Sequence, residues 1–181
     1  MEIHKTPLEG LMVIEPVVFR DKRGYFFESY NQRIFEKKTG AHATFLQDNE
    51  SMSQKGVLRG LHFQTPPFAQ GKLIRVIKGS VMDIAVDIRK NSPTYGQHFS
   101  VMLSEENKKM IWVPIGFAHG FLTTEDNTIF SYKCTQVYNK ASEDSIYWND
   151  PDLNINWGIE DPVLSVKDLQ AKAFKDFNSI F

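Results

Sequence analysis

The chain has 181 residues, of which 41% are apolar and 24% charged, proportions typical of a soluble globular protein. Its formal net charge of −1 gives no electrostatic basis for binding nucleic acid or a membrane surface, so we expect neither partner. The length fits a single domain over residues 1–181. Because the first ten residues lack the apolar core of a signal peptide and the single cysteine, Cys134, has no intrachain partner, we expect a cytoplasmic protein.

Short apolar runs separated by turn residues dominate the chain and predict an all-β sandwich or barrel with a few short peripheral helices. A helix is expected over 31–38, with Asn31 as its N-cap and Gly40 just beyond its end, and a short helix after Ser165. Lys78-Gly79-Ser80 is expected to form a tight turn between two strands. The expected strands cover residues 11–14, 25–30, 43–47, 57–63, 72–78, 81–88, 98–103, 110–113, 121–124 and 128–138.

Alternation in two of these strands predicts which side chains share a face. In 72–78, Lys72 shares a face with Ile74 and Val76. In 81–88, Asp83 lies among small apolar neighbours on one face, and a buried carboxylate there would need a partner. From parity alone we favour an exposed position for Asp83.

Two motifs carry polar residues on otherwise apolar strands. The segment PIGFAHGF, ending at Phe121, matches the P-x-G-x-x-H motif of cupin barrels and places His119 in the barrel. The segment GVLRGLHFQ, starting at Gly56, has His62 followed by Gln64 where cupins usually carry a second histidine ligand. Two histidines without an aligned carboxylate suit a transition metal poorly, so we expect no metal and no cofactor. Taken singly, each histidine is better explained as a hydrogen-bonded core residue; an acid–base role gains weight from their polar neighbours.

Several longer segments together resemble the dTDP-4-dehydrorhamnose 3,5-epimerase family of the cupin superfamily. They are DKRGYFFESY at 21–30, FLQDNESMSQKGVLRGLHFQ at 45–64, GKLIRVIKGSVMDIAVDIRKNSPTYG at 71–96, VPIGFAHGF at 113–121, YKCT at 132–135, WNDP at 148–151 and LSVKD at 164–168. The resemblance covers nearly the whole chain and implies a cupin-type jelly roll. It also implies an isomerase that inverts C3 and C5 of dTDP-4-dehydro-6-deoxy-D-glucose to give dTDP-4-dehydro-L-rhamnose, the epimerisation step of dTDP-rhamnose biosynthesis.

The family implies a role for each matched residue. His62 would be the base, oriented by Asp168, and Tyr132 the acid on the opposite face of the sugar. Lys72 would stabilise the C4 oxyanion, with His119 close by; we hypothesise that His119 pairs with Asp83. A solvated strand end for Lys72 and a core-capping aromatic for Tyr132 are the simpler interpretations of each residue alone.

Substrate binding and assembly also follow from the resemblance. The substrate-binding residues would be Arg23, Glu28, Gln47, Asn49, Arg59, His119, Glu143 and Lys167. The thymine base needs a flat apolar partner, for which Phe19, Phe26 and Tyr138 are the candidates. The family implies a homodimer with exchanged N-terminal strands, in which residues near Arg23 complete the neighbour's site.

Two departures from the family pattern, at Asp144 and at Leu169-Gln170, place the C-terminal edge of the site in question. One alternative is therefore a 3- or 5-mono-epimerase of a related dTDP-4-keto-deoxysugar. Two alternatives of other classes are a non-catalytic sugar-binding cupin and a metal-dependent cupin oxygenase or isomerase. Arg59 and His62 also have opposite strand parity, so both reach one site only if the strand has a bulge or bend near Gly60, or if Arg59 reaches around the rim.

Overall fold

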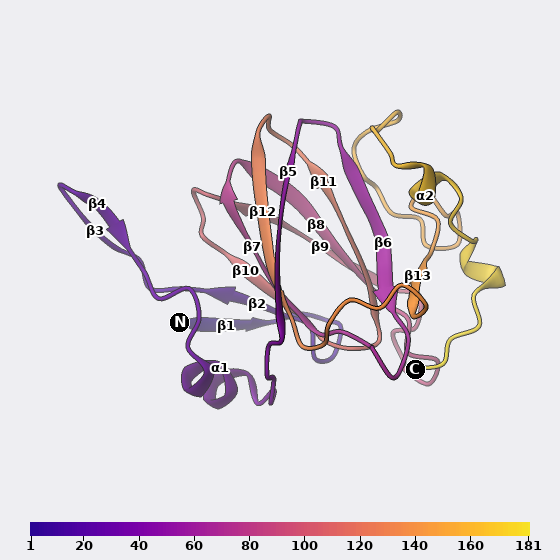
Figure 1. The fold of residues 1–181 in the computed structure, drawn as a ribbon, viewed down its shortest axis with the longest axis horizontal. Coiled ribbons are helices and arrows are strands. Elements are labelled where there is room, and N and C mark those ends of the chain that lie inside the picture. The colour runs from indigo at the N-terminus through magenta and orange to yellow at the C-terminus, as the bar shows by residue number, and fades with distance from the viewer.

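Two antiparallel sheets face each other in the computed structural model, which describes residues 1–181 (Figure 1). The six-stranded sheet has the order β1 (Glu2–Lys5), β2 (Met12–Glu15), β10 (Met110–Val113), β7 (Lys72–Lys78), β12 (Thr128–Cys134) and β5 (Gln47–Ser53). The five-stranded sheet has the order β13 (Glu143–Ser145), β6 (Leu58–Gln64), β11 (Phe117–Thr123), β8 (Ser80–Asp87) and β9 (His98–Ser104). The predicted all-β jelly-roll sandwich of cupin type is confirmed.

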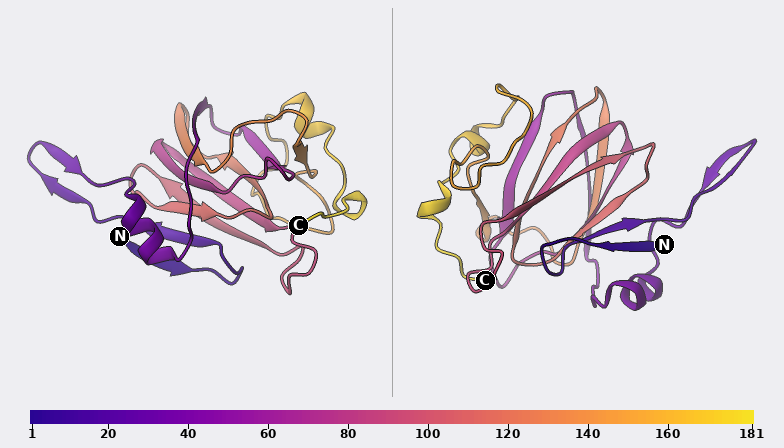
Figure 2. Two further views of the ribbon diagram at one scale, coloured as in Figure 1. Left: turned by 60° about the horizontal axis from the view of Figure 1, so that its bottom comes forward. Right: turned by 180° about the vertical axis from the view of Figure 1, so that it is seen from behind.

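Three apolar clusters hold these layers together. The cluster between the sheets includes Ile74, Val76 and Phe130. A second one covers the outer face of the five-stranded sheet with residues of the C-terminal segment such as Trp157, and a third packs α1 (Gln32–Thr39) against the six-stranded sheet through Phe35. The C-terminal segment and α1 therefore lie on opposite sides of the sandwich (Figure 2).

The alternation predicted for β7 and β8 describes their faces correctly. Lys72 shares the inner face of β7 with Ile74, which lies in the cluster between the sheets. The predicted exposure of Asp83 is wrong: its side chain is fully buried and points into the sandwich. Both faces of β8 are buried because the C-terminal segment covers the outer one, so parity alone does not distinguish inside from outside.

The helices and the tight turn match the prediction closely. Asn31 caps α1 by accepting a hydrogen bond from the Ile34 N–H, and Gly40 follows in the left-handed conformation. Gly79 has φ of 75° in the turn between β7 and β8. A short helix, α2 (Val166–Leu169), begins after Ser165, and one 3₁₀ turn lies at Phe174–Asp176. None of these helices is long and apolar enough to cross a membrane.

Several strand boundaries differ from the prediction. The strand expected over 43–47 is wrong, because β5 begins at Gln47 and runs to Ser53. The strand expected over 128–138 ends at Cys134, and β11 begins at Phe117, four residues before its predicted start. Sequence patterns also missed β1 and β13.

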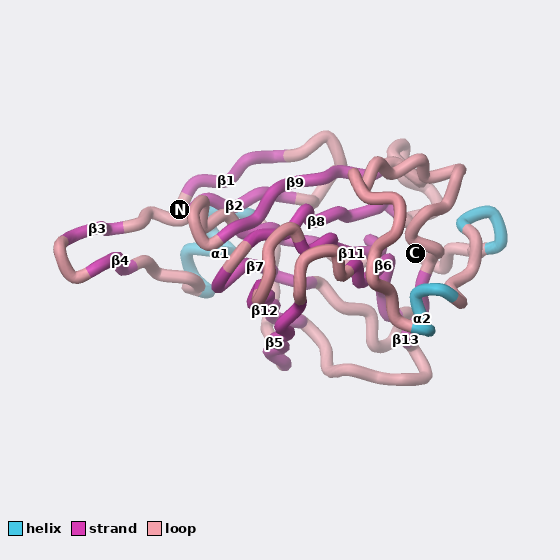
Figure 3. The backbone as a smooth tube through the Cα atoms, turned by 90° about the horizontal axis from the view of Figure 1, so that it is seen from above, coloured by secondary structure: helices cyan, strands magenta, loops and turns pink.

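A two-stranded hairpin, β3 (Phe19–Asp21) and β4 (Gly24–Phe26), projects from the sandwich and pairs with neither sheet (Figures 1 and 3). The strand expected over 25–30 is therefore only partly present. Phe19 and Phe26 are 62% and 70% exposed. Tyr25 is the hairpin's link to the sandwich, since its hydroxyl accepts a hydrogen bond from Lys108.

Candidate active site

A bulge in β6 brings Arg59 and His62 to the same side of the sheet. His62 pairs with His119 and Arg59 pairs with Phe121, so three residue steps on β6 oppose two on β11. The extra residue reverses the strand parity between the two side chains. Gly60 lies inside the bulge, at a cis peptide bond to Leu61, and a Cβ on it would approach the Gly120 Cα to 2.6 Å. The predicted irregularity near Gly60 is confirmed.

Two joined cavities lie between the sheets, with volumes of about 370 and about 180 Å³. They share three lining residues: His62 from β6, Lys72 from β7 and Tyr132 from β12. Arg59 and His119 line the smaller cavity, and Asn49 and Tyr138 line the larger one. His62 rises from the five-stranded sheet, whereas Lys72 and Tyr132 rise from the six-stranded sheet facing it.

Each histidine of this cleft contacts a buried aspartate. His62 Nε2 lies 2.5 Å from Asp168 Oδ1, and His119 Nε2 lies 2.9 Å from Asp83 Oδ2. The hypothesised pairing of His119 with Asp83 is confirmed. Burial alone would raise the pKa of the Asp168 carboxyl, but hydrogen bonds from His62 and from Ser165 outweigh it and hold that pKa below its usual range. Asp168 therefore stays a carboxylate at neutral pH.

The α2 capping box holds the carboxylate that faces His62. Ser165 Oγ donates a 2.6 Å hydrogen bond to Asp168 Oδ2 and accepts one from the Asp168 N–H. One oxygen of Asp168 is thus fixed by the helix start while the other is directed at the imidazole.

Lys72 and Tyr132 lie in surroundings that disfavour their charged forms. Burial lowers the pKa of the Lys72 ammonium, and the carboxylates of Asp83 and Glu143 oppose that change only partly. Burial also raises the pKa of the Tyr132 phenol, which keeps its proton at neutral pH. Arg59 contacts the Ser53 hydroxyl at 3.3 Å and no carboxylate, so its guanidinium is available to an anion.

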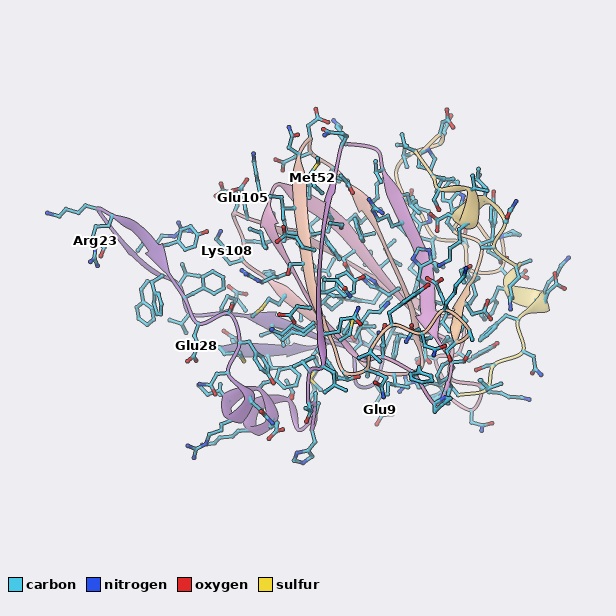
Figure 4. All side chains as sticks on the ribbon, viewed as in Figure 1. Glu9, Arg23, Glu28, Met52, Glu105 and Lys108 are labelled. Carbon is cyan, nitrogen blue, oxygen red and sulfur yellow. The ribbon has the colours of Figure 1, made fainter.

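The remaining predicted residues fall into two groups. At the larger cavity, Glu143 forms an ion pair with Lys167 and accepts a hydrogen bond from the Tyr138 hydroxyl at 3.1 Å. Gln47 and Asn49 lie next to them on β5 and are joined by a 2.9 Å hydrogen bond. The other four predicted residues, Phe19, Arg23, Phe26 and Glu28, lie on or beside the projecting hairpin and not in this chain's cleft (Figure 4).

The departure at Asp144 forms an ion pair with Lys172 of the C-terminal segment. Lys172 Nζ donates to Asp144 Oδ2 at 2.7 Å, and the backbone N–H of Tyr147 donates to the carbonyl of Lys172. The ion pair therefore joins β13 to the C-terminal segment. Leu169, in contrast, is 58% exposed on α2 and takes no part in the cleft.

The donor groups of the cleft do not form a metal-ligand set. No three His, Cys, Asp or Glu side chains converge in a geometry that could hold a metal ion. Gln64, at the position of the second cupin histidine, uses its amide oxygen to accept from the Asn139 N–H at 2.8 Å.

Sequence patterns missed the polar lining contributed by β5. Its inward side chains are Gln47, Asn49, Ser51 and Ser53, whereas Met52 points outward and is 56% exposed. Both faces of β5 are therefore mainly polar, because the exposed positions that alternate with these side chains are Asp48, Glu50 and Met52. Because every residue of β5 except Met52 is polar, apolar alternation gave no signal for this strand.

A jelly-roll cavity that presents an imidazole and a phenol from opposite walls, with an ammonium beside them, defines a cupin-type isomerase acting by proton transfer. The model of the dTDP-4-dehydrorhamnose 3,5-epimerase family matches residues 5–176. An enzyme of that name from Salmonella typhimurium is 53% identical over 172 residues, covering 94% of both chains, and one from Shigella flexneri is 49% identical over 176 residues, covering 97% of both. The chain belongs to the dTDP-4-dehydrorhamnose 3,5-epimerase family.

Solved structures agree with this assignment. The Legionella pneumophila epimerase in complex with dTDP-4-keto-L-rhamnose superposes with a TM-score of 0.94 at 47% identity, over 98% of this chain and 94% of that one. A 3′-monoepimerase from Streptomyces bikiniensis, in complex with dTDP-quinovose, has a TM-score of 0.89 at 32% identity, over 94% and 86% of the two chains.

Proposed function

We propose that residues 1–181 form one catalytic domain that inverts C3 and C5 of dTDP-4-dehydro-6-deoxy-D-glucose without a cofactor, giving dTDP-4-dehydro-L-rhamnose. The C4 ketone acidifies the C–H bonds on both neighbouring carbons, so inversion needs a base on one face of the sugar and an acid on the other. The observation that carries the proposal is the placement of His62 and Tyr132 on facing sheets of one cavity.

His62 is the base in this mechanism. With Nε2–H donated to Asp168, Nδ1 keeps a lone pair that removes the proton from C3 or C5. Asp168 holds the imidazole in this orientation and stabilises the imidazolium that forms.

Lys72 and Tyr132 complete the proton transfer. The enolate oxygen at C4 supplies the counter-charge that the Lys72 ammonium lacks in the free protein, so their attraction is greatest as charge develops. Tyr132 then gives its phenolic proton to carbon from the opposite face. His119, held by Asp83 beside Lys72, lines the smaller cavity and contacts the sugar.

The nucleotide is held by the outer part of the cleft. Arg59 binds the diphosphate, because its guanidinium has no carboxylate partner in the protein. The substrate contacts there come from Gln47, Asn49, Glu143 and Lys167, and Tyr138 offers an aromatic face to the thymine.

We propose a homodimer in which the β3–β4 hairpin enters the neighbouring subunit's cleft. A hairpin with two large, exposed phenylalanines is poorly stable alone and is typical of a contact surface. Arg23, Glu28, Phe19 and Phe26 then complete the partner site instead of their own. A cytoplasmic location is also proposed, supported by the unpaired thiol of Cys134.

Deuterium incorporation tests the reaction. We expect the protein to exchange both C3 and C5 protons of dTDP-4-dehydro-6-deoxy-D-glucose in D₂O, as followed by NMR, and His62→Ala to lose both exchanges. Tyr132→Phe should keep exchange while losing inversion, since abstraction needs only the base. Exchange at one carbon identifies a mono-epimerase, and no exchange refutes the proposed activity.

Mixing two inactive variants tests the exchanged hairpin. In a heterodimer of Arg23→Ala and His62→Ala chains, one site would combine an intact His62 with the partner's intact Arg23. Statistical mixing should therefore restore roughly a quarter of wild-type activity. Mixtures no more active than the separate variants would show that Arg23 serves its own chain or no site.

A further inference from the structure

Gln64 ties together two loops at the mouth of the cleft. It follows His62 by two positions on β6, so its side chain lies on the same face, and it is only 5% exposed. Its Nε2 donates to the carbonyls of Phe68 and Val137 at 2.6 and 3.2 Å, and its Oε1 accepts from the Asn139 N–H at 2.8 Å. Both N–H donors and the carbonyl oxygen of this amide are therefore engaged within the protein.

Gln47 holds the adjoining residue of the same loop from the opposite sheet. Its Oε1 accepts from the Tyr138 N–H at 2.7 Å, and its Nε2 donates to Asn49 Oδ1. Two consecutive backbone N–H groups, those of Tyr138 and Asn139, are therefore bound by two glutamine side chains. Residues 135–142 form no helix or strand, so the two glutamine side chains satisfy backbone N–H groups that a neighbouring strand would bind in a sheet.

Tyr138 depends on this arrangement for its position. Its side chain is 53% exposed, and the hydroxyl bond to Glu143 is its one polar side-chain contact. Its ring lines the cavity that also contains His62, Lys72 and Tyr132. Fixing the backbone of Tyr138 and Asn139 consequently fixes the aromatic wall of the nucleotide side of the cleft.

We propose that Gln64 and Gln47 form an amide clamp on residues 137–139 that positions Tyr138 for nucleotide binding, an inference that rests on the proposed function. Gln64 is a positioning residue in the place where metal-binding cupins carry a ligand. Gln47 lines the same cavity, and besides its proposed contact with the substrate it holds the backbone of Tyr138 through its Oε1.

Substituting Gln64 tests the clamp through nucleotide affinity. Gln64→Glu keeps the size and one acceptor but cannot donate to the Phe68 and Val137 carbonyls. Gln64→Met removes all three hydrogen bonds without burying a charge, and it provides the same test if the glutamate variant does not fold. We expect the Kd for dTDP, from calorimetric titration, and the KM for the sugar nucleotide to rise about tenfold, with kcat changed less than threefold.

Gln54→Glu is the control: Gln54 is exposed, and its amide also donates to and accepts from a loop residue, Asn127, away from the cleft. It should leave the Kd unchanged. The proposal also predicts coupling: in a Tyr138→Ala background, Gln64→Met should weaken dTDP binding by less than twofold.

The outcomes separate the clamp from the proposed function. If wild-type protein does not bind dTDP, the proposed function fails. If dTDP binds to wild type and to Gln64→Met equally well, or if Gln64→Met costs the same tenfold with and without Tyr138, the clamp is refuted.

Discussion

Replacing Lys72 with methionine should have opposite effects on activity and stability. The side chain keeps its length and apolar stem but loses the ammonium, which is the cation nearest to where the C4 oxyanion is proposed to form. Removing one such electrostatic contact typically costs about 10²–10³ in kcat, or about 3–4 kcal/mol of transition-state stabilisation. The upper part of that range applies, because burial strengthens the interaction.

The expected gain in stability follows from the same burial. The pKa of Lys72 is lowered, which means that the folded state binds its proton less favourably than the unfolded state does. Removing the unpaired cation should raise the free energy of unfolding by about 1 kcal/mol, which corresponds to roughly 2–4 °C in Tm for a chain of this size.

The assay pairs steady-state epimerisation with thermal unfolding, and Lys78→Met provides the control. Lys78 lies at the other end of β7, six residues further along, and is exposed. Its replacement should change neither kcat nor Tm appreciably. A Lys72→Met variant that keeps kcat within threefold of wild type, or that unfolds several degrees earlier, would refute the electrostatic role assigned to this lysine.

Three further changes test other contacts. Asp87 is buried and bonded to Arg89, which holds the pKa of its carboxyl at about 2 against an ordinary 3.8. The ionised carboxyl therefore contributes about 2 kcal/mol to the free energy of unfolding above pH 4, and this contribution is lost as pH falls toward 2. The stabilities of Asp87→Asn and wild type, measured by denaturation, should converge in acid. Ser165→Ala removes a hydrogen bond that lowers the pKa of Asp168. The acid limb of the pH–rate profile should therefore move to higher pH and kcat/KM should fall about tenfold, and Ser165→Thr should restore both. An acid limb that does not move would contradict this role of Ser165. Gly60→Ala places a Cβ 2.6 Å from Gly120 Cα and should cost more than about 3 kcal/mol in urea denaturation, whereas wild-type stability would show that the bulge relaxes freely.

Much of the sandwich follows from the sequence because its strands obey simple alternation. The bounds of β7 match the prediction, since apolar residues on its inner face pack against the opposite sheet. The β5 strand does not obey this rule, because its inward face lines a polar cavity and its outward Met52 is exposed. The function of β5 thus removed the signal on which strand prediction depends.

The candidate site also has features that the sequence predicts and features that it does not. Periodicity placed Lys72 on one face with Ile74 and Val76, but the burial of Asp83 depends on the C-terminal segment, which no local pattern reveals. The bulge at Gly60 was predictable because Arg59 and His62 were expected in one site at opposite parity. The clamp on Tyr138 was not predictable from the sequence, because the Gln64 side chain bonds to backbone groups of two separate loops.

The order of strands in the two sheets places the proposed acid–base residues on inner strands and, apart from Arg59 on β6 and His119 on β11, the proposed substrate contacts of the cleft near the edges. His62, Lys72, His119 and Tyr132 lie on strands that are bonded to neighbours on both sides, whereas Gln47, Asn49 and Glu143 lie on the edge strands β5 and β13. A mutation on an edge strand disturbs one ladder, and a mutation on an inner strand disturbs two. A substitution at the rim of the cleft should therefore change substrate binding at a smaller cost in fold stability than a substitution at its floor.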